Sequence, residues 1–345
     1  MSAASGPQHT DAAPLAEKVA FLREPTSYPT GTSAVEAIET HMAWVFLTDR
    51  HAYKLKKPVA YAELDFTTLA RRHWACAEEV RLNRRLAGDV YQGLVPLTAD
   101  PQDTLALGGD GEIVDWLVQM HRLPADRMLD TLIAQGDWPA DGVRAAVRKL
   151  AALYAEAPLV PFTPAEYLQR LHRGLDQTAR ALAASSYAIP LKRVREVYAR
   201  LDGFLRGRSD LLADRVRAHR VAEGHGDLRP EHLCLLQEEP VIFDCIEFDR
   251  SLRLLDVADE LSFLSMECER LGAPDVGTTA LDAYADATGD ALPDRLVHFY
   301  QSYRALQRAQ IAVRHTRRPG TPDEAKWSEQ AAAYLYLAVH HTDSL

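Results

Sequence analysis

The sequence predicts an α+β protein with two lobes: a small sheet-rich first lobe with one long helix, and a larger helical second lobe. Strand-like alternation of apolar and polar residues crowds the first 120 residues. From about residue 124 the apolar residues recur with helical spacing instead, interrupted by one strand hairpin. The chain has 345 residues, 47% of them apolar, which is enough to fill the cores of two lobes.

The first lobe is expected over residues 15–120. Helical spacing predicts a helix at 15–22, a short helical patch at 33–39 and a long helix at 68–87. The predicted strands of this lobe lie at 42–48, 52–57, 95–98, 104–107 and 114–120. The glycines at 108–111 favour a hairpin turn between the last two of these strands.

The second lobe is expected over residues 121–345. Its predicted helices lie at 128–134, 142–157, 164–184, 191–206, 211–223, 257–270, 278–287, 294–315 and 322–341. Two short apolar runs, at 232–236 and 241–246, predict the strands of its hairpin.

Composition excludes several classes of protein. A net charge of -10 and a pI near 5.7 argue against a nucleic-acid-binding protein. No run of about 18 apolar residues predicts a membrane span, and residues 1–14 resemble a mobile tail rather than a signal peptide. The four cysteines lack zinc or redox spacing and indicate reduced thiols. We therefore expect a cytoplasmic protein with no evident protein partner.

The strongest motif is the octapeptide HGDLRPEH at residues 225–232. The catalytic loop of protein kinases reads HRDLxxxN, and the chain matches it at His225, at Asp227 and at the Leu that follows. Gly226 replaces the Arg of that loop, and His232 stands where it has Asn. The HGD form is similar to the loop of aminoglycoside phosphotransferases and related small-molecule kinases.

The chemistry of phosphoryl transfer explains this spacing. A carboxylate beside the attacking hydroxyl orients it and accepts its proton, which is the role expected of Asp227. We expect Asp227 and His225 to form the catalytic part of the site.

A second carboxylate, Asp244, follows seventeen residues after Asp227 at the end of an apolar strand, where kinases hold Mg²⁺. The alternative is an Asp that caps the next turn. His232 is a poor partner for Mg²⁺, since imidazole suits softer cations. It could accept Mn²⁺, hold a water on the metal, bind a phosphate, or only pack in the hairpin.

Two lysines on one predicted strand are candidates for contacting the phosphates of a nucleotide. In the kinase pattern VAIK the Ala and the Lys share one strand face, and Ala52 and Lys54 have that relation. Lys56 shares the face and is the second candidate. A glutamate on the following helix must hold the lysine, and helical spacing favours Glu79 over Glu78 as the inward one.

Neither a GxGxxG loop nor a Walker A motif accompanies these lysines. Backbone N–H groups, or the side chains of Thr40 and His41, could contact phosphate instead. Gln119 and Met120 lie on the predicted hinge strand, where backbone groups would bind adenine. The alternative for that strand is a buried structural strand.

Five segments carry a family resemblance: THMAWVFL at 40–47, YKLKKPV at 53–59, LDF at 64–66, RLNRRL at 81–86 and FDCIEF at 243–248. They resemble a bacterial family of aminoglycoside-phosphotransferase-like proteins, over most of residues 30–315. The resemblance implies a protein-kinase-like fold and the use of ATP and Mg²⁺. Longer relatives append a P-loop ATP-binding domain, so this chain is expected to be a single-domain member. Glu260 stands where relatives have the Asp that braces the catalytic region.

The acceptor is expected to be a small molecule. Few residues separate Asp244 from the next helix, and no APE motif follows, so a protein-kinase activation segment does not fit. Glu247 and Asp249 could contact a cationic amino sugar, an aminoglycoside or another carbohydrate-like acceptor. The alternative function is a pseudokinase that binds nucleotide and acts as a regulatory binding module.

Overall fold

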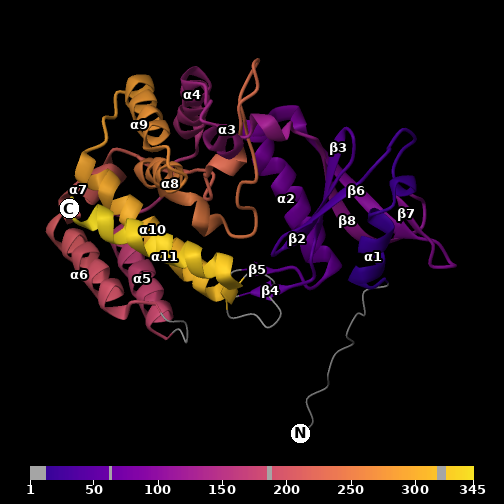
Figure 1. Ribbon diagram of the computed structural model, residues 1–345, viewed down its shortest axis with the longest axis horizontal. Coiled ribbons are helices and arrows are strands. Elements are labelled where there is room, and N and C mark those ends of the chain that lie inside the picture. The colour runs from indigo at the N-terminus through magenta and orange to yellow at the C-terminus, as the bar shows by residue number, and fades with distance from the viewer. Residues whose placement is uncertain (1–12, 62–63, 185–188, 317–323) are drawn as a thin grey trace, which may run out of the picture. The chain divides into compact units, whose positions relative to one another are not determined.

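The computed structural model describes residues 13–61, 64–184, 189–316 and 324–345 (Figure 1). It divides into two compact units. The first contains residues 1–124 and 241–250, and the second contains residues 125–240 and 251–345. The predicted tail at 1–14 lies outside the described residues as far as residue 12.

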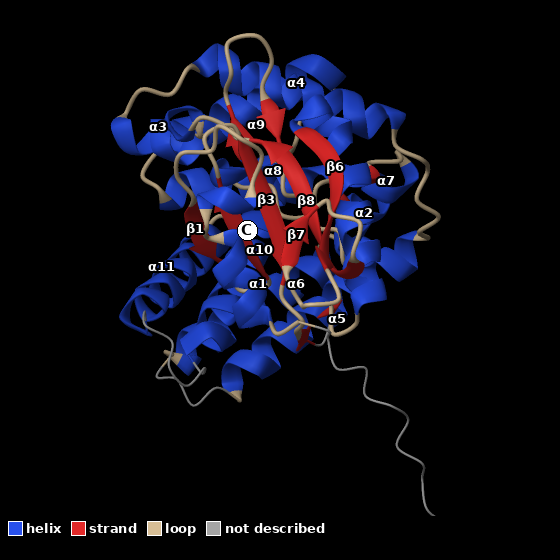
Figure 2. Cartoon of the chain, turned by 90° about the vertical axis from the view of Figure 1, so that its right-hand side faces the viewer, coloured by secondary structure: helices blue, strands red, loops and turns tan. Residues whose placement is uncertain are grey.

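A six-stranded antiparallel sheet forms the centre of the first unit, in the order β1-β2-β3-β8-β6-β7. Figure 2 shows β3, β8 and β6 side by side in red. The strand bounds are Glu36–Glu39 (β1), Ala43–Leu47 (β2), His51–Lys56 (β3), Tyr91–Ala99 (β6), Leu105–Leu107 (β7) and Glu112–His121 (β8). A separate small hairpin pairs β4 (Ala60–Tyr61) with β5 (Leu64–Asp65).

Two helices complete the first unit. The helix α1 spans Leu15–Leu22, and α2 spans Leu69–Ala87. The side chain of Thr68 caps α2 by accepting a hydrogen bond from the N–H of Arg71, and the helix ends at Gly88, whose φ of 51° lies in the left-handed half of the map. Because α2 packs on β6 and β8, its inward face is fixed against the sheet.

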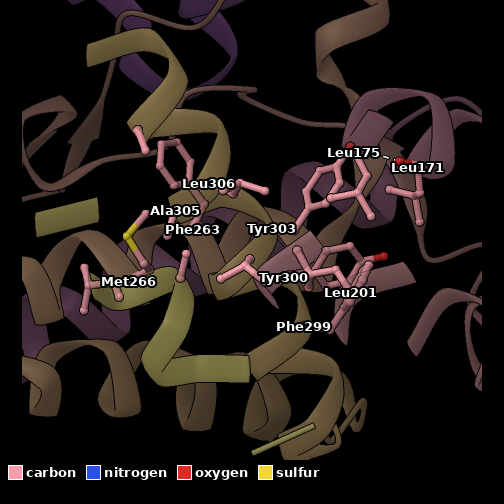
Figure 3. Close-up of a cluster of buried hydrophobic side chains, with 14 of the residues drawn as sticks. Leu171, Leu175, Leu201, Phe263, Met266, Phe299, Tyr300, Tyr303, Ala305 and Leu306 are labelled. Carbon is pink, nitrogen blue, oxygen red and sulfur yellow. Dashed lines mark hydrogen bonds between the residues drawn. The ribbon is translucent and has the colours of Figure 1, made fainter. Parts of the chain in front are cut away.

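The second unit is mainly helical. Its helices are Leu129–Gln135 (α3), Ala140–Glu156 (α4), Pro164–Ala183 (α5), Leu191–Gly207 (α6), Ser209–Arg217 (α7), Val257–Arg270 (α8), Pro274–Thr288 (α9), Asp294–Thr316 (α10) and Glu324–Thr342 (α11). Figure 1 shows α10 and α11 side by side, and they pack closely along their lengths. Figure 3 shows part of the core of this unit, where side chains of α5, α6, α8 and α10 meet.

Short strands flank the loop that carries the HGD motif. Val221–Glu223 (β9) pairs antiparallel with Leu254–Asp256 (β12), just before α8. The predicted hairpin strands are shorter than expected, Leu233–Cys234 (β10) and Val241–Ile242 (β11). The second of these belongs to the first unit, together with the rest of residues 241–250.

Two sequence predictions about local structure are wrong. Residues 33–39 were expected to be helical, but Glu36–Glu39 forms β1, because pairing with β2 satisfies a segment too short for a stable helix. Residues 211–223 were expected to form one helix. The helix ends at Arg217, His219 adopts a φ of +56°, and the chain then enters β9.

The remaining helices agree with the prediction to within a few residues, and residues 322–323 of the last predicted helix lie outside the described part of the chain. None of the described helices combines the length and the apolar character that crossing a bilayer requires.

Candidate functional site

Five charged side chains of the first unit form a continuous row of alternating sign, which we call the charge row. Lys54 on β3 contacts Glu79 at 2.9 Å and Asp244 at 2.6 Å, measured from its Nζ to the carboxylate oxygens. The other oxygen of Glu79 contacts the Nζ of Lys56 at 2.6 Å. Lys56 also forms an ion pair with Glu247. The order is therefore Asp244, Lys54, Glu79, Lys56, Glu247.

The strand and helix periods place these residues. Along β3, Lys54 and Lys56 share one face, since successive strand residues alternate, and the interleaved Tyr53 and Leu55 belong to the apolar core on the other face. On α2, Glu79 lies on the buried face, as its helical spacing predicted. Glu78, in contrast, pairs with Arg81, three residues along the helix.

Each charge in the middle of the row is stabilised by its neighbours. Burial opposes the charged form of Lys54, but Asp244 and Glu79 outweigh burial and hold the pKa of Lys54 well above its ordinary value. Burial likewise opposes the ionised form of Glu79, and Lys54 and Lys56 outweigh it and lower the pKa of Glu79. At neutral pH these groups are therefore charged.

The segment that carries Asp244 is held by hydrogen bonds from several elements. Asp244 has a φ of +61°, which is unusual for a residue with a side chain and requires support from its surroundings. The backbone N–H of Asp244 donates to the hydroxyl of Tyr91 at 3.3 Å, and that of Cys245 donates to Asn83 Oδ1 at 2.9 Å. Phe248 packs against the small apolar cluster around Phe66.

In the second unit, Glu260 on α8 organises the HGD loop. Its carboxylate accepts hydrogen bonds from the backbone N–H groups of His225 at 2.9 Å and Gly226 at 2.5 Å, and from the hydroxyl of Tyr154 at 2.6 Å. A Cβ at Gly224 would lie 2.3 Å from Glu260 Oε2, so this position has no room for a side chain. The Glu that replaces the Asp of the family resemblance thus reaches the loop directly.

Asp227 lies next to an arginine and two histidines. Arg229 Nε donates to Asp227 Oδ2 at 3.0 Å, and its guanidinium also contacts Glu231. The Nδ1 of His225 accepts from the N–H of Asp227 at 3.3 Å, and the His225 side chain is fully buried. His225 therefore shapes the loop from within and does not face solvent.

His232 uses both ring nitrogens inside the loop. Its Nδ1 lies 2.8 Å from the carbonyl oxygen of Asp227, which can only accept, so Nδ1 donates. Its Nε2 lies 3.2 Å from Arg229 Nη2, which can only donate, so Nε2 accepts. Both ring nitrogens of His232 thus have partners within the loop.

The surroundings of Asp227 favour its ionised form. Burial opposes that form, but the neighbouring Arg229 guanidinium, with smaller electrostatic contributions from His232, Arg308 and His225, outweighs burial and lowers the pKa of Asp227 to about 2. The carboxylate is thus ionised throughout the neutral range and is a weak proton acceptor.

Asp244 is the residue that best fits Mg²⁺. Its side chain is 40% exposed and offers carboxylate oxygens, the ligands that hard cations prefer. Among the described residues, no group of three or more His, Cys, Asp or Glu side chains is arranged to hold a metal ion. A single exposed carboxylate is compatible with Mg²⁺, because in nucleotide sites one or two carboxylates, the phosphates and water usually complete the coordination shell of this ion.

The other predicted site residues occupy separate places in the first unit. The hydroxyl of Thr40 donates to the carbonyl of Ala43 at 2.9 Å within the turn before β2. His41 stacks on Tyr61, with ring centroids 4.9 Å apart. Gln119 and Met120 are half-buried residues of β8, opposite Tyr53 and Ala52 of β3. Asp249 is half-buried in the same segment as Asp244.

Sequence reasoning missed three residues of these clusters. Arg229 lies only two positions after Asp227, and no strand or helix period runs through this loop to indicate that the two side chains would meet. Arg308 on α10 affects the pKa of Asp227, and the hydroxyl of Tyr91 on β6 binds the backbone of Asp244. In each case the two residues lie far apart in the sequence. No local pattern of residues marks them.

Comparison by sequence finds relatives but no matching family model. Uncharacterized proteins of Mycobacterium tuberculosis and Mycobacterium bovis are 33% identical to the chain over 311 residues. That match covers 89% of this chain and 59% of each relative, so the chain spans less than two thirds of their length.

Comparison by structure identifies the fold. A choline/ethanolamine kinase family protein from Mesorhizobium loti has a TM-score of 0.53 at 16% identity, covering 95% of this chain and 99% of its own. Choline kinase from Cryptosporidium parvum has a TM-score of 0.54 at 9% identity, covering 95% and 96%. The GDP complex of aminoglycoside 2′-phosphotransferase-IIIa has a TM-score of 0.51 at 14% identity, covering 95% and 98%. The predicted kinase-like α+β fold is thereby confirmed.

Proposed function

We propose that the protein is a phosphotransferase that moves the γ-phosphate of ATP to a hydroxyl group of a small molecule. The observation that carries the proposal is the position of Lys54, which contacts Glu79 at 2.9 Å and Asp244 at 2.6 Å. A strand lysine held by a helix glutamate, beside a metal-binding Asp, is the arrangement that kinases need for catalysis. The kinase-like fold supports the same function.

In the first unit, Lys54 would contact the α- and β-phosphates, and Asp244 would hold the metal. Magnesium, when bound, would neutralise charge on the phosphates. Glu79 keeps the Lys54 ammonium in place and is itself fully buried. The backbone of β8 around Gln119 and Met120 would bind adenine, and Thr40 and His41 remain candidates near the phosphates.

In the second unit, Asp227 would orient the acceptor hydroxyl and take its proton. With a pKa of about 2 it is a weak base, so orientation is the larger part of its role and proton transfer comes late, as suits a loose transition state. His225 and Glu260 position the loop, because both bind its backbone directly.

We propose that the acceptor is an amino sugar, an aminoglycoside or another carbohydrate-like alcohol. The names of the structural neighbours add choline and ethanolamine to the compounds worth testing. Glu247 is paired with Lys56 and almost buried, so Asp249 is the better candidate for contacting an acceptor amine. ATP use and four cysteines without zinc or redox spacing fit a cytoplasmic protein.

A pseudokinase is the second candidate. Arg229 is bound to the carboxylate of Asp227, and His232 replaces the Asn that kinases use for a second metal ion. Such a protein would bind nucleotide without transferring phosphate.

Calorimetry of ATP binding with Mg²⁺, with Mn²⁺ and with EDTA tests the proposal. We expect metal-dependent binding that weakens in Asp244→Ala. We also expect Asp227→Asn to keep ATP binding and to lose ADP formation with every acceptor that the wild type uses. ATP binding that is equally strong with and without the metal would favour the pseudokinase. A folded sample that binds no nucleotide under any condition would end the kinase proposal.

A further inference from the structure

We propose that Lys56 and Glu247 are positioning residues, a buried ion pair that fixes the segment carrying Asp244 for the metal–nucleotide complex. The part of this inference that concerns metal and nucleotide rests on the proposed function. The part that concerns the conformation of residues 243–248 does not.

The exposed fraction of the side chains falls from Asp244 to Glu79 and stays low beyond it. The side chain of Asp244 is 40% exposed and that of Lys54 is 15% exposed, whereas Glu79 is completely buried. Beyond Glu79, Lys56 is 2% exposed and Glu247 is 8% exposed. The row therefore has one open end, at Asp244, and one closed end. A ligand can reach Asp244 and Lys54, but Lys56 and Glu247 face the interior of the first unit.

Glu79 makes the two lysines dependent on each other. Its Oε1 binds Lys54 and its Oε2 binds Lys56, so the carboxylate cannot rotate without weakening one of the two ion pairs. A kinase needs only one lysine on this glutamate. The second lysine fixes the plane of the carboxylate and hence the direction from which Lys54 is held.

Glu247 connects the closed end of the row back to the open end through the chain. It lies three residues after Asp244 in the same segment, and its carboxylate binds Lys56. The Nζ of Lys56 also lies 5.0 Å from the ring centroid of Phe66, and Phe248 packs in the cluster around that ring. Charge and apolar contacts thus fix residues 247 and 248 to the same place.

This attachment supports the strained backbone at Asp244. A φ of +61° at a residue with a side chain persists only when its surroundings hold it. The hydrogen bonds to Tyr91 and Asn83 hold residues 244 and 245, and the Lys56–Glu247 pair holds the other side of the segment. Outer residues that orient a metal ligand commonly change metal affinity about 10- to 100-fold when mutated.

Hydrogen exchange in the protein without ligands tests the conformational part. The variants are Glu247→Gln, which removes one charge, and the double variant Lys56→Met with Glu247→Gln, which removes the pair without leaving Glu247 charged. We expect the amides of residues 243–248 to exchange roughly tenfold faster in both variants, with unchanged exchange in β6 and β7. The matched control is Lys57→Met, since Lys57 pairs instead with Glu39, at 2.5 Å. It should leave the segment unchanged.

The ratio of ATP affinity with Mg²⁺ to ATP affinity with EDTA tests the positioning part. We expect this ratio to fall about tenfold in Glu247→Gln, with partial recovery in Glu247→Asp, while metal-free ATP binding stays near the wild-type value. A residue that only stabilised the fold would lower the melting temperature without changing the ratio. Lys57→Met should keep the wild-type ratio.

The outcomes separate this inference from the proposed function. If the wild type binds no nucleotide, the proposed function fails, and the exchange experiment alone then decides whether the pair fixes the segment. If the wild type binds Mg-ATP, and the folded Glu247→Gln and double variants keep both the wild-type exchange at 243–248 and the wild-type ratio, the inference is overturned.

Discussion

The backbone N–H of His225 donates to the carboxylate of Glu260 across 2.9 Å, and this hydrogen bond ties the HGD loop to α8. The N–H of Gly226 binds the same carboxylate. The loop that carries Asp227 therefore takes its shape from a residue of a neighbouring helix. The geometry of this loop depends on how closely the Glu260 carboxylate can approach the loop backbone.

Gly224 sets that approach, so we expect Gly224→Ala to be destabilising. The new Cβ would lie 2.3 Å from Glu260 Oε2, and the carboxylate would have to leave two buried N–H groups without their acceptor. We expect a loss of about 1–3 kcal/mol in the free energy of unfolding, measured in urea, together with reduced phosphotransfer.

Gly203→Ala is the matched control for this substitution. Gly203 lies within α6, and a Cβ there meets no atom within 4 Å. Because Ala favours helix over Gly, the control should be neutral or stabilising by up to about 1 kcal/mol. Equal effects of the two substitutions would show that the contact with Glu260 does not limit residue 224.

The depressed pKa of Asp227 predicts a specific loss of stability in acid. Because the folded pKa of about 2 lies below the ordinary value of 3.8, ionised Asp227 stabilises the fold above that ordinary value. This contribution is lost as the pH falls through about 2. We expect it to amount to about 2 kcal/mol at neutral pH.

Urea unfolding of the wild type and of Asp227→Asn between pH 6 and pH 2.5 measures this contribution. The difference between the two proteins should shrink as the pH falls below 4. Asp214→Asn, at an exposed ion pair with Arg217, is the control and should show a much smaller change. A constant difference across the whole range would contradict the depressed pKa.

Local patterns predicted one half of the candidate site well. The strand period put Lys54 and Lys56 on one face, and the helix period put Glu79 on the buried face of α2. Both depend only on neighbours within one element. The roles of these residues remain proposals, but their proximity to Asp244 is present in the structure.

Contacts between distant parts of the chain could not be read from such patterns. Nothing near Glu247 in sequence indicates that it would bind Lys56 rather than an acceptor. Arg308 lies on α10, far along the chain from Asp227, and only the packing of the second unit gives it an electrostatic effect there. The strands β9 and β12 have three residues each, too few to show a period, so the pair was missed.

A buried ion triplet in the first unit predicts a large effect of Asp115→Asn on stability. Asp115 on β8 contacts Lys18 of α1 and Arg72 of α2, both at 2.8 Å, and all three side chains are buried. Asn would remove the negative charge that both buried cations contact, at a cost of about 3–5 kcal/mol.

Thermal unfolding of Asp115→Asn beside Asp141→Asn measures this cost. Asp141 is almost fully exposed and pairs with Arg144 one helical turn away, so its substitution should change the free energy of unfolding by less than about 0.5 kcal/mol. Similar melting temperatures for the two variants would mean that the triplet contributes little.

Arg229 offers the sharpest test of how Asp227 works. In Arg229→Met the burial of Asp227 is no longer opposed by its strongest positive neighbour, so the pKa of Asp227 should rise toward its ordinary value. The carboxylate would also lose the contact that fixes its orientation. We expect phosphotransfer to fall about tenfold or more, with ATP binding unchanged, and the acid limb of the rate profile to move to higher pH.

Arg229→Lys keeps the charge and should restore the position of the acid limb, with only part of the rate, because an ammonium cannot reproduce the forked contact with Asp227 and Glu231. A faster Arg229→Met enzyme would instead mean that Arg229 restrains the base, which is the behaviour expected of an inhibited or regulatory kinase fold.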